Sequence, residues 1–359
     1  MTMQKTKRFP VFYTVYFIFI ALVLVLIHIG LGIVKTYLAD YESARPQYEA
    51  ERVFAEYYAS GDFSKLVDQC EVPLTEYETA DTLCRYLTAF TDDKELTYSQ
   101  ITTGLDTSVK YIVKADNIKF SAFTLKESDK KTEKGFSLYE VSDFELYCAA
   151  NETVSITAPK GYTVLVNGAE VPDTALSGEE AKDKSCSFMP EGVEGIVYLE
   201  YVIDDMYLPP DSVTVLSPDG RECTVTAEGA VFTADVLYEE VIPEDRNAYI
   251  IDAAKAISKY MQNDAMFYSV SGYIDPESEL YEYLKTSLTY FVIKHNSYDF
   301  EDVRTSEFYQ YDENTFSCRI SFTHVLKRTN MEDYKDYIDT TFFFRRVGDA
   351  FLIYDRYNH

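Results

Sequence analysis

The chain has 359 residues and a formal net charge of −27, from 60 acidic and 33 basic residues. So acidic a surface repels phosphate backbones, which argues against nucleic-acid binding, and it disfavours anionic lipid surfaces and anionic wall polymers. Cationic ligands, metal ions and basic protein patches stay open as partners. The length predicts two or three domains. An aromatic content of 15%, with 32 Tyr and no Trp, favours sheet-rich domains.

A membrane-spanning helix is the first element expected. Residues 11–34 contain no Asp, Glu, Lys or Arg, and a helical rise of about 1.5 Å per residue lets them cross a hydrocarbon core of about 30 Å. Three basic residues precede the segment (Lys5, Lys7 and Arg8) and acidic residues follow it, which predicts a cytoplasmic tail over residues 1–10 and an extracytoplasmic body. A cleaved signal peptide is the alternative, but its apolar core would be shorter. We therefore expect a single-pass cell-membrane protein.

Two later stretches, residues 45–148 and 245–357, each place predicted helices before a run of predicted strands, which is an α+β order. In the first stretch, we expect helices over Pro46–Ser60, Phe63–Cys70 and Ala80–Phe90, and strands over Leu96–Thr103, Ser108–Lys114, Ile118–Leu125 and Gly135–Cys148. In the second stretch, we expect helices over Arg246–Gln262 and Glu277–Lys294, and strands over Val303–Tyr311, Thr315–Leu326, Ile338–Val347 and Ala350–Tyr357.

Short motifs recur between these two stretches. The helix ends at Tyr58–Asp62 and Tyr260–Asp264 share an aromatic residue, a residue that tolerates left-handed backbone geometry, and an aspartate suited to cap the next helix. The segments Val141–Asp143 and Val347–Asp349 are each typical of a tight hairpin turn between aromatic-rich strands. The two matches have nearly the same spacing, which predicts duplicated domains.

A different pattern separates the two stretches. Residues 151–241 contain short alternating runs and strong turn signals, such as Asn167-Gly168 and Pro218-Asp219-Gly220, and predict a small β-sandwich. Its expected strands are Val154–Thr157, Tyr162–Val166, Ile196–Val202, Ser212–Leu216 and Glu222–Thr226. The fold class predicted for the whole chain is α+β, with one transmembrane helix and two cone-like domains that flank this sandwich.

The helix–aromatic–x–x–Gly/Asn–Asp element, followed by a curved-sheet pattern, resembles the nuclear transport factor 2-like superfamily. Residues 342–354 look like the last hairpin of that superfamily. The resemblance covers about residues 45–148 and 245–357, and it implies cone-shaped domains without diagnostic catalytic residues. The layout is similar to envelope proteins of monoderm bacteria. More loosely, it resembles teicoplanin-resistance-associated membrane proteins and the tandem-domain scaffold subunits of conjugation machines.

Motifs for catalysis, cofactors and metals are missing from the sequence. It has no phosphate-cradling glycine loop, no zinc or calcium motif and no C-x-x-C, so we expect no cofactor and no metal. Asp204-Asp205 is a weak cation-site candidate, because adjacent strand residues point to opposite faces. Of the six cysteines, Cys70 and Cys84 are a candidate disulfide pair.

His324 is the most informative single residue. It shares one strand face with Phe322 and Ile320, and these three side chains are the ligand-pocket candidates, because the concave face of a cone-shaped domain lines a pocket. Enzymes of the resembled superfamily place an acid–base group there. The alternative is a core histidine satisfied by a backbone carbonyl or a tyrosine hydroxyl.

These observations predict a non-enzymatic, membrane-anchored binding or scaffolding protein of the bacterial cell envelope. Its partner would be another protein or a wall-associated ligand. One alternative is a small-molecule binder or an enzyme that uses the pocket of the second cone. The other is a subunit of a secretion or conjugation apparatus.

Overall fold

The computed structural model describes residues 11–101, 108–286 and 292–359. The chain forms two compact units, of which the first comprises Met1–Thr153 with Asp204–Pro209 and the second Val154–Ile203 with Pro210–His359. The small β domain expected over residues 151–241 therefore belongs mostly to the second unit. The expected cytoplasmic tail, residues 1–10, lies outside the described residues.

Helix α1 (Val11–Ser43) continues past the apolar segment that the sequence marks out. It is the one helix in the described part of the chain that is long and apolar enough to cross a membrane. Most of its large apolar side chains are exposed. The described part of α1 therefore buries none of its large apolar side chains within the protein.

The first unit confirms the order of helices before strands. Its elements are α2 (Pro46–Tyr57), α3 (Ser64–Val67), α4 (Ala80–Thr91), β1 (Leu96–Ile101), β2 (Val109–Ala115), β3 (Ile118–Lys131) and β4 (Ser137–Leu146). The strands form one antiparallel sheet in the order β1-β2-β3-β4. Proline at position 46 starts α2, where its missing N–H costs nothing. Gly61 takes the expected left-handed geometry with a φ of +73°.

One of the two expected hairpin turns is wrong. Val141–Asp143 lies inside β4, where Thr124 pairs with Asp143 and Leu125 with Val141, so that the residue between forms a β-bulge. The segment lacks a glycine for a tight turn, and the strand pairing simply continues through it. Val347–Asp349 does turn, with Gly348 at a φ of +63° and Val347 opposite Ala350.

The β domain of the second unit consists of two sheets, with strand orders β10-β6-β7 and β11-β12-β5-β9-β8. Its elements are β5 (Glu152–Pro159), β6 (Thr163–Val166), β7 (Ala169–Glu170), η1 (Asp173–Ala175), β8 (Leu176–Lys182), η2 (Lys184–Phe188), β9 (Val197–Met206), β10 (Val213–Leu216), β11 (Val225–Glu228) and β12 (Val231–Ala234). Asn167 and Gly168 form the expected turn, with φ values of +50° and +85°. The sequence did not predict β7, β8, β12 or the two short helices.

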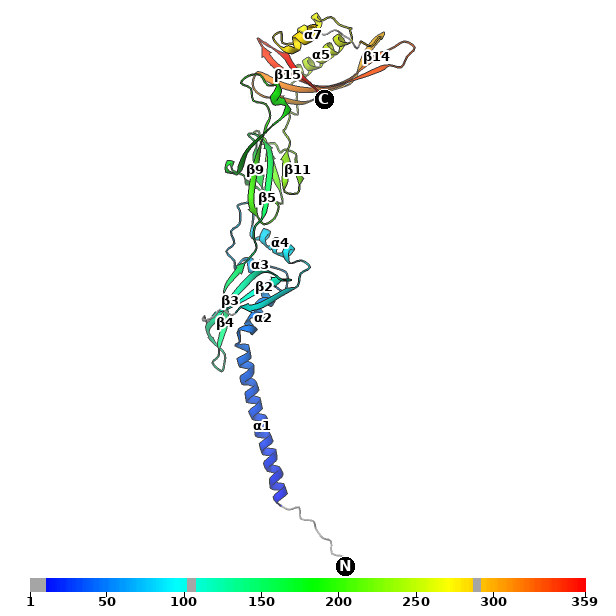
Figure 1. The fold of residues 1–359 in the computed structure, drawn as a ribbon. Helices are drawn as coiled ribbons and strands as arrows, with labels where there is room; N and C mark the ends of the chain where they lie inside the picture. Colours follow the sequence, from blue (N-terminus) through cyan, green and yellow to red (C-terminus); the bar gives the residue numbers. More distant parts are fainter. Residues whose placement is uncertain (1–10, 102–107, 287–291) are drawn as a thin grey trace, which may run out of the picture. The chain divides into compact units, whose positions relative to one another are not determined.

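The rest of the second unit is a second α+β arrangement. Its elements are α5 (Glu244–Met261), α6 (Tyr268–Ser271), α7 (Glu279–Thr286), β13 (Ser297–Gln310), β14 (Thr315–Lys327), β15 (Tyr334–Val347) and β16 (Ala350–Asn358). The strands again pair in chain order, and α5 and α7 lie over one face of their sheet (Figure 1). The prediction of a helix over Glu277–Lys294 is only partly correct, because α7 ends at Thr286 and residues 292–294 are not helical. Residues 287–291 lie outside the described part of the chain.

Neither of the two aspartates expected to cap a helix is an N-cap residue, since Phe63 precedes α3 and Phe267 precedes α6. The Asp62 carboxylate accepts hydrogen bonds from the backbone N–H of Ser64 at 3.0 Å and from its hydroxyl at 2.7 Å. Asp264 caps no helix. Its carboxylate pairs instead with Nε2 of His295 at 2.9 Å. Asn263 does adopt the expected left-handed geometry, with a φ of +66°.

Candidate functional site

The three side chains that the sequence proposed as a ligand pocket lie in the interior of the second unit. His324, Phe322 and Ile320 are each 0% exposed. Nδ1 of His324 forms a hydrogen bond with the Ser258 hydroxyl of α5 at 2.9 Å, and the imidazole stacks on Phe300 at 4.5 Å. In the described part of the chain, His324 is therefore a fully buried residue that packs between α5 and β13. The alternation of β14 was read correctly, but the face it identified is the one that packs against the helices.

Burial has an electrostatic consequence for His324. It lowers the pKa of the imidazole, since the charged form would lose its hydration, and nearby His295 and Lys259 lower it further while Asp264 opposes them. Nε2 of His324 meets no hydrogen-bond partner among the described residues. Protonation of this ring is therefore disfavoured in the folded protein.

We expect the second unit to lose stability as the pH falls below the unfolded histidine value of 6.5. The folded-state pKa of His324 is depressed, so its stabilising contribution is complete above 6.5 and is lost as the pH falls through the lower folded value. Chemical denaturation at a series of pH values from about 7.5 down to about 5, a range that brackets the histidine pKa, should show this loss. His324→Gln should make that pH profile flatter. An unchanged slope in the variant would contradict this assignment.

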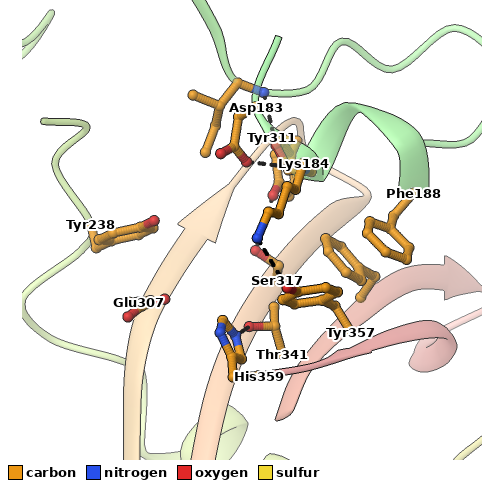
Figure 2. Close-up of a pocket in the computed structure, with 13 residues that line it drawn as sticks. Asp183, Lys184, Phe188, Tyr238, Glu307, Tyr311, Ser317, Thr341, Tyr357 and His359 are labelled. Atoms are coloured by element: carbon orange, nitrogen blue, oxygen red, sulfur yellow. Dashed lines mark hydrogen bonds between the residues drawn. The ribbon is translucent and has the colours of Figure 1, made fainter.

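A cavity of about 260 Å³ lies in the second unit, among η2, the segment after β12 and the strands of the β13–β16 sheet (Figure 2). The residues that line it are Asp183, Lys184, Ser185, Phe188, Ile196, Tyr238, Glu307, Tyr311, Ser317, Thr341, Phe343, Tyr357 and His359. We call this cavity the junction pocket. Aromatic rings, hydroxyls and a few charged groups from distant parts of the chain meet in it.

Stacked rings form one wall of the junction pocket. Phe188 of η2 stacks on Phe343 of β15 at a centroid distance of 4.6 Å, and it lies 6.0 Å from Tyr357 of β16. Tyr311 and Ser317 are joined through their hydroxyls at 3.1 Å. Burial raises the pKa of Tyr311 and of Tyr238, so both phenols stay protonated hydrogen-bonding groups.

Lys184 reaches into the junction pocket from η2. Its ammonium donates to the phenolic oxygen of Tyr357 at 3.0 Å, and this hydrogen bond raises the pKa of the lysine. Asp183 accepts a hydrogen bond from the backbone N–H of Ser185 at 2.8 Å and so caps η2. Figure 2 shows Lys184 pointing toward the Ser317 and Tyr357 side of the pocket.

Glu307 supplies the second carboxylate of the junction pocket. It lies at a bulge of β13 with a φ of +50°, and it accepts a hydrogen bond from the Arg319 guanidinium at 2.7 Å. Arg319 also forms paired hydrogen bonds with Asp339 across the sheet and thereby lowers the pKa of that carboxyl. A fixed guanidinium thus orients Glu307 at the edge of the cavity.

Local close packing holds η2 in place. A Cβ atom added to Gly195 would lie 2.7 Å from Cα of Cys186, which is too close for two carbon atoms. This position therefore accepts only glycine. The thiol of Cys186 also donates to the carbonyl of Ile196 at 3.2 Å. These contacts fix the short helix that carries Lys184 and Phe188.

The junction pocket was not predicted from the sequence, although the sequence contains one feature that points to it. Phe342, Phe343 and Phe344 are consecutive, and all three are buried. Because neighbouring strand residues point to opposite faces, three successive buried aromatics require packing on both faces of β15. Phe342 and Phe344 join the core beneath the helices. Phe343 faces the junction pocket.

The other sequence candidates form no site. No cluster of three or more His, Cys, Asp or Glu that suits a metal occurs among the described residues. The Asp204 carboxylate accepts a hydrogen bond from the Thr153 hydroxyl at 2.7 Å. Cys70 and Cys84, proposed as a disulfide pair, are free thiols in this structure.

Comparisons with known proteins add little. No protein family matches the sequence, and no curated protein matches it. One solved structure, described as an Ntf2 like protein involved in plasmid conjugation, aligns over 84% of this chain and 89% of its own. It is 11% identical, with a TM-score of 0.22. A TM-score this low does not establish a shared fold.

Proposed function

We propose that this chain is a membrane-anchored, non-catalytic binding protein whose extracytoplasmic body captures a basic segment of another protein in the junction pocket. The observation that carries the proposal is the junction pocket itself, in which stacked aromatic rings lie beside two carboxylates. An exposed apolar helix that ties such a pocket to a membrane suits a receptor or a scaffold.

The size and the charge of the junction pocket favour a protein partner. Its volume of about 260 Å³ lies below the range of about 300–1,000 Å³ that is typical of small-molecule sites. It does suit one large side chain, and anchor side chains in pockets dominate protein–protein affinity. Its two carboxylates, Asp183 and Glu307, outnumber its one ammonium group, Lys184, and the chain has a net charge of −27, which would attract a basic partner surface.

Site-specific photocrosslinking from the intact membrane tests this proposal. A benzophenone amino acid replaces Tyr238 in the junction pocket or, as a matched control, Tyr337, which is 67% exposed on the same unit. We expect a discrete crosslinked partner from Tyr238 at about ten times the control yield, since an anchor side chain in a pocket lies in contact with its lining residues. Added salt should lower the yield. Equal yields from the two positions would exclude the junction pocket as the binding site.

An enzymatic role is the second candidate, and one contact favours it. The Thr341 hydroxyl and Nε2 of His359 lie 2.9 Å apart in the junction pocket, within the reach that a base needs to activate a hydroxyl. An activated threonine would react with a fluorophosphonate probe. A mass gain on the peptide that contains Thr341 would favour an enzymatic role over simple binding. An unmodified peptide would exclude Thr341 as a nucleophile.

A further inference from the structure

The turn between β3 and β4 packs against the end of helix α1 (Figure 1). The ring of Phe136 makes edge contacts with Tyr37 and Tyr41, at centroid distances of 5.2 and 5.3 Å. The backbone N–H of Lys134 donates to the Asp40 carboxylate at 3.0 Å. These contacts lie within the first unit and fix the depth of the hairpin relative to the apolar helix.

That depth corresponds to the polar layer of a bilayer. The apolar segment ends at Val34, and Tyr37 and Tyr41 follow it on the same continuous helix. At a rise of about 1.5 Å per residue, the backbone of Tyr37 lies roughly 5 Å beyond the apolar segment and that of Tyr41 roughly 10 Å, at the outer boundary of the headgroups. The headgroup layer of a bilayer is about 5–8 Å thick on each side of the hydrocarbon core. Tyrosine is also enriched at this level of membrane proteins.

The hairpin carries exposed positive charge at this level. Lys130, Lys131 and Lys134 are all exposed, and no ion pair joins them to another residue in the described part of the chain. Residues 126–137 contain four lysines and three acidic residues (Glu127, Asp129 and Glu133), so the hairpin carries a net positive charge, which is concentrated toward its tip. Because the Debye length is about 8 Å at physiological ionic strength, a membrane surface senses these local charges rather than the net charge of the distant body.

We propose that the β3–β4 hairpin is a second membrane contact, whose lysines bind the anionic phospholipid headgroups of the bilayer that α1 spans. The aromatic contact of Phe136 with α1 places the hairpin, and the three ammonium groups supply the lipid affinity. The hairpin thereby braces the first sheet against the membrane surface. This site is separate from the junction pocket, and it depends on α1 spanning the membrane.

Lipid photolabelling of the full chain in nanodiscs tests the proposal. The discs contain phosphatidylcholine alone or phosphatidylcholine mixed with phosphatidylglycerol, together with a lipid that carries a diazirine in its headgroup. Mass spectrometry then locates the labels. We expect the peptide over residues 126–137 to be labelled about fivefold more in the anionic discs, since each lysine near an anionic surface adds to the attraction. This excess should decrease as salt is added.

Charge reversal gives a second, independent measurement. Lys130→Glu, Lys131→Glu and Lys134→Glu together should abolish the excess labelling in anionic discs. The same change at three lysines elsewhere in the first unit (Lys65, Lys114 and Lys119) should leave it intact. Equal labelling of the wild-type hairpin in neutral and anionic discs would overturn the proposal whether or not the variants fold. So would a hairpin that remains unlabelled in both kinds of disc.

Discussion

Phe344→Ala is expected to lower the free energy of unfolding of the second unit by about 3–5 kcal/mol, the usual cost of removing a buried aromatic ring. Phe344 is 0% exposed and stacks on Phe316 at a centroid distance of 4.5 Å. It also packs near Phe342 and Tyr249. Loss of the ring would leave a cavity between the sheet and α5 that the surrounding strands cannot close.

Urea denaturation of the full chain in detergent, followed by hydrogen exchange to assign the transition to the second unit, measures this effect. Tyr337→Ala is the control on the same strand, because Tyr337 is 67% exposed. Its effect should stay within about 0.5 kcal/mol. A loss below about 1 kcal/mol for Phe344→Ala would show that this face of β15 is not the packed core.

Asp275→Ala is expected to destabilise the second unit by about 2–3 kcal/mol, because the hydrogen bonds that this buried carboxylate accepts are lost. The Asp275 side chain is 1% exposed and pairs with the Arg345 guanidinium of β15. This hydrogen bond raises the pKa of Arg345. The same carboxylate accepts a hydrogen bond from the N–H of Glu277 at 3.0 Å, and the backbone N–H of Asp275 donates to the carbonyl of Ile353 at 2.9 Å.

These bonds tie the loop between α6 and α7 to the sheet. Asp275→Ala would therefore increase hydrogen exchange in α7 before the rest of the unit unfolds. A double-mutant cycle with Arg345→Ala separates the ion pair from the turn contacts. Asp349→Ala, in the exposed turn between β15 and β16, is the control. A coupling energy near zero between Asp275 and Arg345 would contradict the role of the pair.

Local patterns were sufficient for much of the fold. Residues 11–34 form a helix that is long and apolar enough to cross a membrane, as length and polarity alone predict. Gly61, Gly348 and the Asn167-Gly168 pair marked real chain reversals, because their left-handed backbone is a local requirement that few residues meet. Val141–Asp143 failed as a turn since a short polar segment without glycine is equally compatible with a bulge inside a paired strand.

The alternation along β14 identified a real face but not its environment. Periodicity states which residues share a face, and Phe322 and His324 do share one. It does not state what covers that face. Ser258 of α5 meets His324 from far along the chain, and this contact makes the histidine a core residue. A cone-shaped domain with an open pocket and one whose interior is filled by side chains have the same alternation of residues along their strands.

The sequence by itself determined the long apolar helix, the α+β order and the turns at Gly348 and at Asn167-Gly168, which need a positive φ. Only the tertiary structure decided where a pocket lies. The junction pocket forms because η2 brings Lys184 and Phe188 onto Tyr357 and Phe343, which are far away in the sequence. Such contacts depend on how whole elements pack, and packing between distant segments leaves little periodicity in the chain. The middle one of three consecutive phenylalanines in β15, Phe343, was the one local sign of this pocket.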